Sequence, residues 1–293
     1  MIRRTFQLVR GVGPSREKML WADGFARWDD FPQPGGPVAL SEKLDETARG
    51  HLGEARRALE AHDLLALATM VPPREHWRLY GEFAGDAVYF DIETEGMTGA
   101  PTVVSLFHAK GFQVFFQGKD LDELPEAMAR WPLWVSFNGS NFDAPVLAHY
   151  FGRRFPKPAM HLDLCHVGRR MGWRGGLKKI EDSLGFGRPS HLKGVDGLDA
   201  IFLWRYWHAT KDVAALRLLA EYNLYDSIQL RTLAARVYNR GIEKLGLDEP
   251  ILPVYERGDV LYDITRYLLT LGPEGNVETA LDRARRWAQG GTA

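Results

Sequence analysis

Two acidic residues stand where their side chains could share a metal ion. Asp91 and Glu93 lie two positions apart at the end of a short apolar run that starts at Ala87 and is typical of a buried strand. Side chains two apart on a strand point to the same face. Close carboxylates repel each other and raise each other's pKa unless a cation lies between them. Oxygen ligands favour magnesium or manganese over zinc. A solvated strand end is the alternative interpretation of this pair alone.

A third acid, Asp143, follows a second strand-like run. The run Leu133–Phe137 gives way to a turn of glycine and asparagine, and a helix should begin at Asp143. Asp143 could therefore be a helix N-cap, with Pro145 in the first helical turn. That interpretation does not explain the apolar Phe142 before it, and a capping residue can also bind a metal. Both interpretations stay open at this point.

The fourth acid, Asp226, lies on a predicted helix. Tyr222 precedes it by four positions and shares its face of the helix. The same stripe holds residues that should face the core: Leu216, Leu219, Asn223, Leu230 and Leu233. An acid on an apolar stripe needs a partner to offset its loss of solvation. We therefore interpret Asp226 as a functional residue.

The elements that must position these residues predict an α/β fold. Further strands are expected over residues 102–107, 112–116 and 161–164, with a tight turn at 110–111. Helices are expected over 41–68, over 120–130 with Asp120 as N-cap, over 143–150, and through most of the chain from there to about Lys244. Three early strands, a helix, another strand and then helices predict a mixed sheet flanked by helices.

Together the acidic segments resemble the three motifs of the DEDD exonucleases, in the tyrosine subtype. The segments are Phe90–Thr94, Phe137–Pro145 and Tyr222–Asp226. They are especially similar to the proofreading domains of family B DNA polymerases. They are also similar to the bacterial YprB-type ribonuclease H-like proteins, and the compact length of this chain fits that second group better. Two further stretches, His161–Leu164 and Gly176–Glu181, are similar as well. The resemblance covers Asp86 to about Val237 and implies a ribonuclease H-like fold.

The resemblance implies a two-metal 3′–5′ exonuclease. The expected substrate is single-stranded nucleic acid, with DNA slightly favoured over RNA. The ligands of two Mg²⁺ or Mn²⁺ ions would be Asp91, Glu93, Asp143 and Asp226. One ion would generate hydroxide from bound water, and the other would stabilise the departing 3′ oxygen. The neutral phenol of Tyr222 would orient the attacking water. A non-catalytic nucleic-acid-binding scaffold protein and a structure-selective endonuclease are the alternatives. The intact set of acids argues against the scaffold protein. Analysis of the cleavage products would distinguish an endonuclease from an exonuclease.

A basic stretch over residues 153–193 suits a nucleic-acid partner. It holds ten lysines and arginines against three acidic residues, although the net charge of the whole chain is −1. Basic groups bind phosphates, and interleaved aromatic residues such as Trp173 can stack on unpaired bases. A solvated charged face is the alternative. The substrate contacts expected here and at the turn are Asn138, Asn141, Phe142, Arg169, Arg170, Lys178 and Lys179.

The sequence predicts four segments. They are a helix-hairpin-helix-like segment with a linker over 1–36, a helical connecting region over 37–84, a ribonuclease H-like exonuclease domain over 85–245, and a C-terminal helical tail over 246–293. Gly11 and Gly13 resemble the hairpin of a helix-hairpin-helix motif and would contact a DNA backbone through N–H groups. A plain turn is the alternative. The linker is expected over residues 32–37. An amphipathic helix is expected over Val277–Trp287.

Composition excludes several classes of protein. No stretch approaches the roughly 20 consecutive apolar residues of a membrane span. No long apolar segment follows the basic N-terminal residues, so a secretory signal is not expected. The expected location of the protein is the cytoplasm. Cys165 is the single cysteine, which excludes intramolecular disulfides and cysteine-based zinc sites. His161, His166 and His191 fit no zinc pattern and are interpreted as structural residues or phosphate contacts. No protein partner is predicted.

Overall fold

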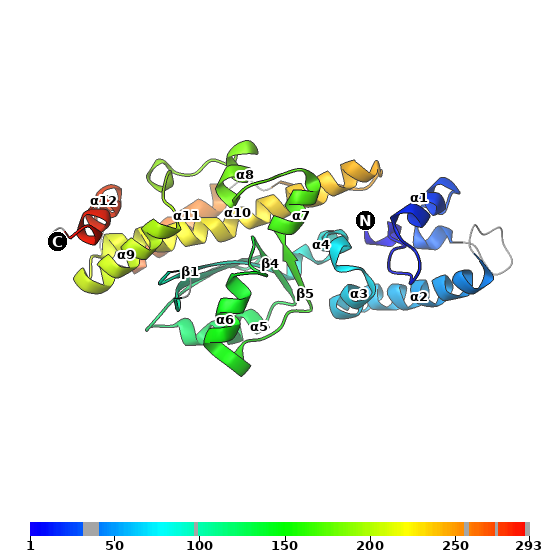
Figure 1. Cartoon of the computed structure of the whole chain (residues 1–293), viewed down its shortest axis with the longest axis horizontal. Coiled ribbons are helices and arrows are strands. Elements are labelled where there is room, and N and C mark those ends of the chain that lie inside the picture. The colour runs from blue at the N-terminus through cyan, green and yellow to red at the C-terminus, as the bar shows by residue number, and fades with distance from the viewer. Residues whose placement is uncertain (32–40, 97–98, 255–257, 273–274, 291–293) are drawn as a thin grey trace. The chain divides into compact units, whose positions relative to one another are not determined.

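The chain forms two compact units (Figure 1). The computed structural model describes residues 1–31, 41–96, 99–254, 258–272 and 275–290. The first unit comprises Met1–Gly85 and Ala235–Leu252, and the second comprises Asp86–Ala234 and Pro253–Ala293. The long helix α10, Val213–Leu245, contributes to both units. The expected linker, 32–37, lies outside the described residues, and the expected tail, 246–293, is divided between the two units.

A mixed five-stranded sheet in the order β3-β2-β1-β4-β5 forms the centre of the second unit. The strands are β1 Ala87–Thr94, β2 Pro101–His108, β3 Gly111–Phe116, β4 Leu133–Ser136 and β5 Met160–Asp163. Strands β1, β2 and β3 pair antiparallel, whereas β4 runs parallel to both β1 and β5. The structure thus confirms the predicted α/β fold with a mixed sheet.

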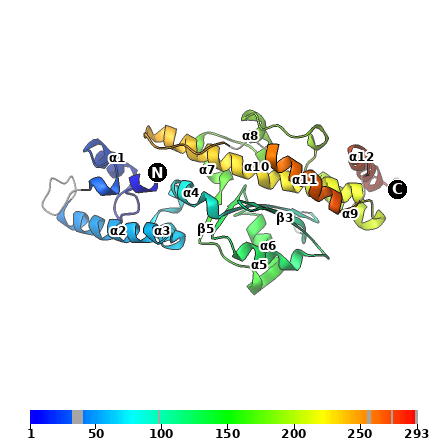
Figure 2. The same cartoon turned by 180° about the vertical axis from the view of Figure 1, so that it is seen from behind.

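Helices cover both faces of this sheet (Figures 1 and 2). On one face lie α5 Leu124–Ala129 and α6 Asp143–Phe151, and on the other lie α10 and α11 Gly258–Thr270. The remaining helices of the unit are α7 Leu164–Met171, α8 Leu177–Ser183, α9 Gly197–Thr210 and α12 Val277–Ala288. No helix among the described residues is long and apolar enough to cross a membrane.

The alternation of side chains along β1 separates the hydrophobic core from the acidic residues. Val88, Phe90 and Ile92 are buried in a core cluster with residues of α5 and α6. Because successive strand residues point to opposite faces, Asp91 and Glu93 point toward the face that α10 covers. One strand therefore anchors the core with one set of residues and presents two carboxylates with the other.

The expected helix over 120–130 is shorter than the pattern suggests. A 3-10 turn, Leu121–Glu123, precedes α5. Asp120 was expected to cap the helix, but its side chain makes no capping hydrogen bond and instead accepts from the backbone N–H of Phe116 at 2.7 Å. Asp120 thus occupies the N-cap position of the 3-10 turn, but its side chain closes the turn after β3 and does not cap the helix.

Besides the end of α10, the first unit holds the helices α1 Pro14–Ala22, α2 Glu42–Glu60, α3 Leu64–Met70 and α4 Trp77–Phe83. The expected continuous helix over 41–68 is interrupted at His62, whose φ is 52°. The turn at Gly11 has φ of 93°, and Gly13 caps the start of α1. Only a 3-10 turn, Ile2–Arg4, precedes this turn, so the described N-terminal residues lack the first α-helix of a helix-hairpin-helix motif.

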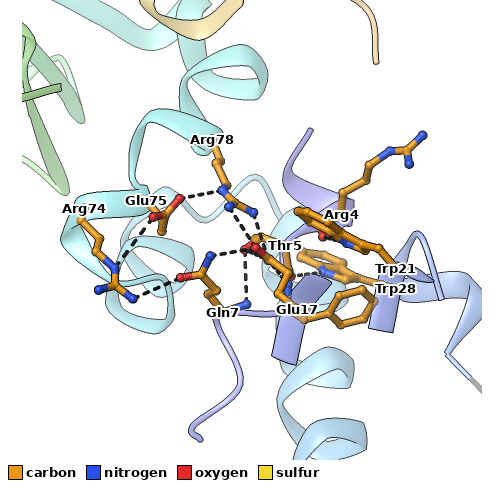
Figure 3. Close-up of polar contacts among 10 residues, drawn as sticks. Arg4, Thr5, Gln7, Glu17, Trp21, Trp28, Arg74, Glu75 and Arg78 are labelled. Carbon is orange, nitrogen blue, oxygen red and sulfur yellow. Dashed lines mark hydrogen bonds and ion pairs between the residues drawn. The ribbon is translucent and has the colours of Figure 1, made fainter. Parts of the chain in front are cut away.

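A buried polar cluster fastens the N-terminal residues to α4 within the first unit (Figure 3). Glu17 on α1 accepts hydrogen bonds from both terminal nitrogens of Arg78 at 3.0 Å. It also accepts from Thr5 Oγ1 at 2.9 Å and Gln7 Nε2 at 2.7 Å, and Glu75 accepts from Arg78 Nε at 2.8 Å. Removing one member of such a buried pair leaves an uncompensated charge, so this cluster holds its elements in one arrangement.

Candidate functional site

Three carboxylates converge at the end of β1. One oxygen from each of Asp91, Glu93 and Asp226 lies within 4.8 Å of the other two. Asp91 and Glu93 come from β1, and Asp226 comes from α10, more than a hundred residues later. The structure thus brings together three of the four acids that the sequence singled out.

Short polar side chains hold α10 close to the sheet at this point. Ser105 on β2 lies opposite Asp91. Its hydroxyl donates to the backbone oxygen of Asn223 at 2.9 Å and lies 2.6 Å from Ser227 Oγ. Asn223 Nδ2 in turn donates to Asp91 Oδ2 at 2.8 Å. These contacts place Asp226, three residues after Asn223, over the carboxylates of β1. The sequence pattern predicts only that Asn223 lies on the core-facing stripe of the helix, although a buried amide on that stripe is a signal of such a role.

Asp143 contacts the same strand through the strand's backbone. It is the first residue of α6, and Phe142 occupies the N-cap position. The N-cap interpretation of Asp143 is therefore wrong. Its Oδ1 instead accepts a hydrogen bond from the backbone N–H of Ile92 at 3.2 Å. Strand β4 pairs with β1 only as far as Tyr89, so this N–H remains open to Asp143. The bond ties Asp143 to the residue between the two acids of β1.

The turn before Asp143 has a constrained backbone. Asn138 has φ of 63°, and a Cβ on Gly139 would lie 2.3 Å from Ser136 Oγ. The buried carboxylate of Asp163 accepts from the backbone N–H groups of Asn138 at 2.8 Å and Ser140 at 3.1 Å. Asp163, which is not among the predicted site residues, therefore fixes the turn that leads into α6.

The outer side of this turn offers polar groups to solvent. Asn138 and Asn141 are exposed. Asn141 Nδ2 lies 3.1 Å from Asn138 Oδ1 and 3.1 Å from His166 Nε2 on α7. Arg169 and Arg170, one helical turn further along α7, are also exposed. These four expected substrate contacts thus lie on the solvent side of the turn and of α7.

The other expected substrate contacts lie in different surroundings. Phe142 is partly buried and packs against the core cluster between the sheet and α5 and α6. Lys178 Nζ donates to Tyr222 Oη at 2.7 Å and lies 4.5 Å from the centroid of that ring. Lys179 is exposed. The two glycines of the N-terminal turn, Gly11 and Gly13, belong to the first unit, whereas the acids belong to the second.

Burial dominates the electrostatics of the acids. It raises the pKa of the Asp91 and Glu93 carboxyls well above their usual range, and repulsion from Asp226 raises both further. Burial also raises the pKa of Asp143 to about 7. Burial, followed by repulsion from Asp226, raises the pKa of Tyr222 as well, so its phenol is neutral at pH 7. The expectation that neighbouring acids raise each other's pKa has the right direction, but burial is the larger cause.

The oxygen ligands fit a hard divalent cation. Mg²⁺ and Mn²⁺ take carboxylate oxygens and leave positions for water and phosphate. The carboxylates of Asp91, Glu93 and Asp226 supply such ligands within 4.8 Å of one another. Asp91 and Glu93, whose pKa values are raised, also need a nearby positive charge before both can ionise. The cluster is therefore consistent with divalent-metal binding.

The comparison with protein families agrees with this geometry. The model that describes the RNase H superfamily matches residues 88–238. No curated protein matches the chain. The matched range contains strands β2 to β5, all of β1 except Ala87, and the four acids Asp91, Glu93, Asp143 and Asp226, and it spans just over half of the 293 residues. The chain therefore belongs to the RNase H superfamily.

Proposed function

We propose that this protein is a divalent-metal-dependent nuclease that removes nucleotides from the 3′ end of single-stranded nucleic acid. The observation that carries the proposal is the convergence of Asp91, Glu93 and Asp226 within 4.8 Å, with Tyr222 one helical turn before Asp226. Membership of the RNase H superfamily implies a nucleic-acid substrate. The 3′–5′ direction and the preference for single strands rest on the resemblance of the three motifs.

The acids that would hold two ions are Asp91, Glu93, Asp143 and Asp226. Bound there, the ions would lower the pKa of a water molecule and neutralise charge on the departing 3′ oxygen. The protein orients two of these ligands through hydrogen bonds of its own. Asn223 holds Asp91, and the backbone N–H of Ile92 holds Asp143. Such outer contacts reduce the cost of assembling the site.

Tyr222 would hold the attacking water. Its raised pKa keeps the proton on Oη at neutral pH. Lys178 Nζ donates to that oxygen at 2.7 Å, which occupies one of its acceptor positions and fixes the ring. The phenol hydrogen then remains available to donate to a water molecule. Tyr222 would thus orient the water without taking part as a charged base.

The substrate strand would meet the outer side of the turn and α7. Exposed Asn138 and Asn141 lie there beside His166, and the exposed Arg169 and Arg170 follow on the same helix. Arginines bind phosphates without reading bases, and side-chain amides donate to phosphate oxygens. A strand held in this way would place its terminal phosphodiester near the carboxylates.

Digestion of 5′-labelled single-stranded DNA and RNA with Mg²⁺ or Mn²⁺ tests the proposal. The wild type should produce a ladder that shortens from the 3′ end, and Asp91→Asn should abolish it. Asp182→Asn, an exposed acid on α8, should leave the ladder unchanged. Cleavage of a circular single strand would show an endonuclease instead. Binding without any cleavage, equal in wild type and Asp91→Asn, would contradict the nuclease and favour the scaffold.

A further inference from the structure

Arg188 lies at the carboxylate cluster although it comes from an irregular segment after α8. Its side chain is 8% exposed. Nη2 forms an ion pair with Asp226 Oδ1 and lies 2.7 Å from Glu181 Oε2. Nε donates to the same Glu181 oxygen at 2.8 Å. One guanidinium therefore bridges a buried acid of α8 and a member of the carboxylate cluster.

The charge on Arg188 acts on two members of the cluster, Asp226 and Asp91. A guanidinium stays protonated at every pH at which proteins fold. Attraction to Arg188 opposes the rise in the pKa of Asp91 that burial and the neighbouring acids cause. Arg188 thus supplies at Asp226 part of the positive charge that a divalent ion would supply there. A cation bound to Asp226 would repel a guanidinium in contact with the same carboxylate.

The pair with Glu181 is incomplete. Arg188 Nη1 and Glu181 Oε1 are both buried and have no hydrogen-bond partner among the described residues. An arginine and a carboxylate can form two parallel hydrogen bonds, and here only one oxygen of Glu181 is used. Glu181 therefore has an acceptor left for Arg188 once the contact with Asp226 is broken.

Lys178, also near the cluster, does not have this freedom. Its Nζ donates to Tyr222 Oη and to the backbone oxygen of Val195. Neither partner is a member of the carboxylate cluster. Of these two described cations beside the acids, only Arg188 contacts a carboxylate that a metal ion would also bind.

We propose that Arg188 is a resident counter-cation that competes with a divalent metal ion for Asp226. It pairs with Asp226 when no ion is bound and moves to a two-bond pair with Glu181 when an ion binds. The inference rests on the metal-dependent nuclease function proposed above. It adds that the apparent metal affinity of the enzyme is set partly by the release of Arg188 from Asp226, because a site that must first give up another contact binds more weakly.

A Mn²⁺ titration of the full chain, followed by the electron paramagnetic resonance of free Mn²⁺, tests this competition. Arg188→Gln should bind Mn²⁺ roughly tenfold more tightly than the wild type, since about 1.4 kcal/mol of competing interaction corresponds to a factor of ten. In EDTA, Arg188→Gln should melt at a lower temperature than the wild type. Adding Mn²⁺ should raise its melting temperature by more than it raises that of the wild type. Arg130→Gln removes an exposed arginine that pairs with Glu126 at 3.3 Å and should change neither value. Equal or weaker Mn²⁺ binding by Arg188→Gln would overturn the proposal.

Arg188→Lys separates direct competition from a general effect of charge, and it also serves if Arg188→Gln does not fold without metal. Lysine keeps the charge but cannot bridge two acids with a planar fork. Direct competition predicts tighter Mn²⁺ binding by Arg188→Lys, whereas a purely long-range effect predicts the wild-type affinity and would overturn the proposal. Failure of the wild type itself to bind Mn²⁺ would instead contradict the proposed nuclease function, so the two failures are distinguishable.

Discussion

Asn223 on α10 donates a 2.8 Å hydrogen bond to Asp91 on β1, which links the helix that carries Asp226 to the strand that carries the other acids. Asn223 is completely buried. Its amide lies between the two elements whose separation decides whether the three carboxylates can share an ion. The bond therefore connects the packing of α10 on the sheet to the geometry of the cluster.

Replacing Asn223 with alanine should weaken metal binding. Loss of an outer-shell partner typically lowers metal affinity by about 10- to 100-fold. Leaving a buried carboxylate oxygen without its donor should also cost about 1–3 kcal/mol of stability. Mn²⁺ titration and urea unfolding measure the two effects. Ser227→Ala, which breaks the neighbouring contact with Ser105 but does not touch Asp91, should lower stability without lowering Mn²⁺ affinity to the same degree.

Tyr222→Phe should slow cleavage and leave Mn²⁺ binding unchanged. A group that orients the attacking water contributes to the chemical step, and we expect a loss of about 100-fold in the single-turnover rate. Lys178→Met should produce a smaller loss that disappears in the Tyr222→Phe background, because the two side chains act through one hydrogen bond. Lys193→Met, an exposed lysine, is the control for the lost charge. Fully additive losses would show that Lys178 acts independently of Tyr222.

Gly139→Ala should destabilise the second unit and impair the site. The new Cβ would lie 2.3 Å from Ser136 Oγ and 2.6 Å from Ser136 Cβ, so the turn must shift. Such overpacking costs about 1–3 kcal/mol, and Asp143 follows directly on the displaced backbone. Gly197→Ala is the matched control, since an added Cβ there would meet no heavy atom of the described residues within 4 Å beyond its chain neighbours and the nearby backbone of its own helix. Denaturant unfolding of both variants in EDTA measures the difference. Equal stability of the two would contradict the predicted clash.

Without metal, stability should fall as the pH rises toward neutrality. Burial raises the pKa of both Asp143 and Glu181 to about 7. The native state therefore holds more protons than the unfolded state between about pH 4 and 7, and the stability gained from protonation is lost as the pH rises through that window, by about 1.4 kcal/mol per pH unit and group. Thermal unfolding in EDTA from pH 5 to 8 measures this slope. Asp143→Asn should reduce it, and an unchanged slope would show that Asp143 is ionised in the native state.

The strands and the three converging acids could be predicted from local patterns. A strand covered on both faces needs an apolar run, and β1, β2, β3 and β4 each have one, whereas β5 alternates apolar and polar residues. The two-residue spacing of Asp91 and Glu93 and the helical stripe around Asp226 predict which faces these carboxylates share. Both patterns are local in sequence, so they can be recognised without knowledge of the tertiary contacts.

The contacts that organise the site could not be predicted in this way. The stripe reveals that Asn223 is buried, but its partner Asp91 lies 132 positions away. Arg188 stands in an irregular segment without periodicity, 38 positions from Asp226. Asp143 looks like an N-cap because local pattern cannot show the N–H of Ile92 that its carboxylate meets. In each case a distant partner, and not the neighbouring sequence, decides the role.

The first unit takes part of its structure from residues that are synthesised late. Residues of α10 pack against α4 so closely that a Cβ on Gly81 would lie 2.5 Å from Tyr238, and one on Gly241 would lie 2.3 Å from Trp77. Glu249, shortly after α10, accepts from Arg4 Nε at 2.6 Å. At a synthesis rate of about 5–20 residues per second, Met1–Gly85 would wait on the order of ten seconds for Ala235–Leu252 to follow. The first unit to leave the ribosome can thus complete its packing only after the chain of the whole sheet has been made.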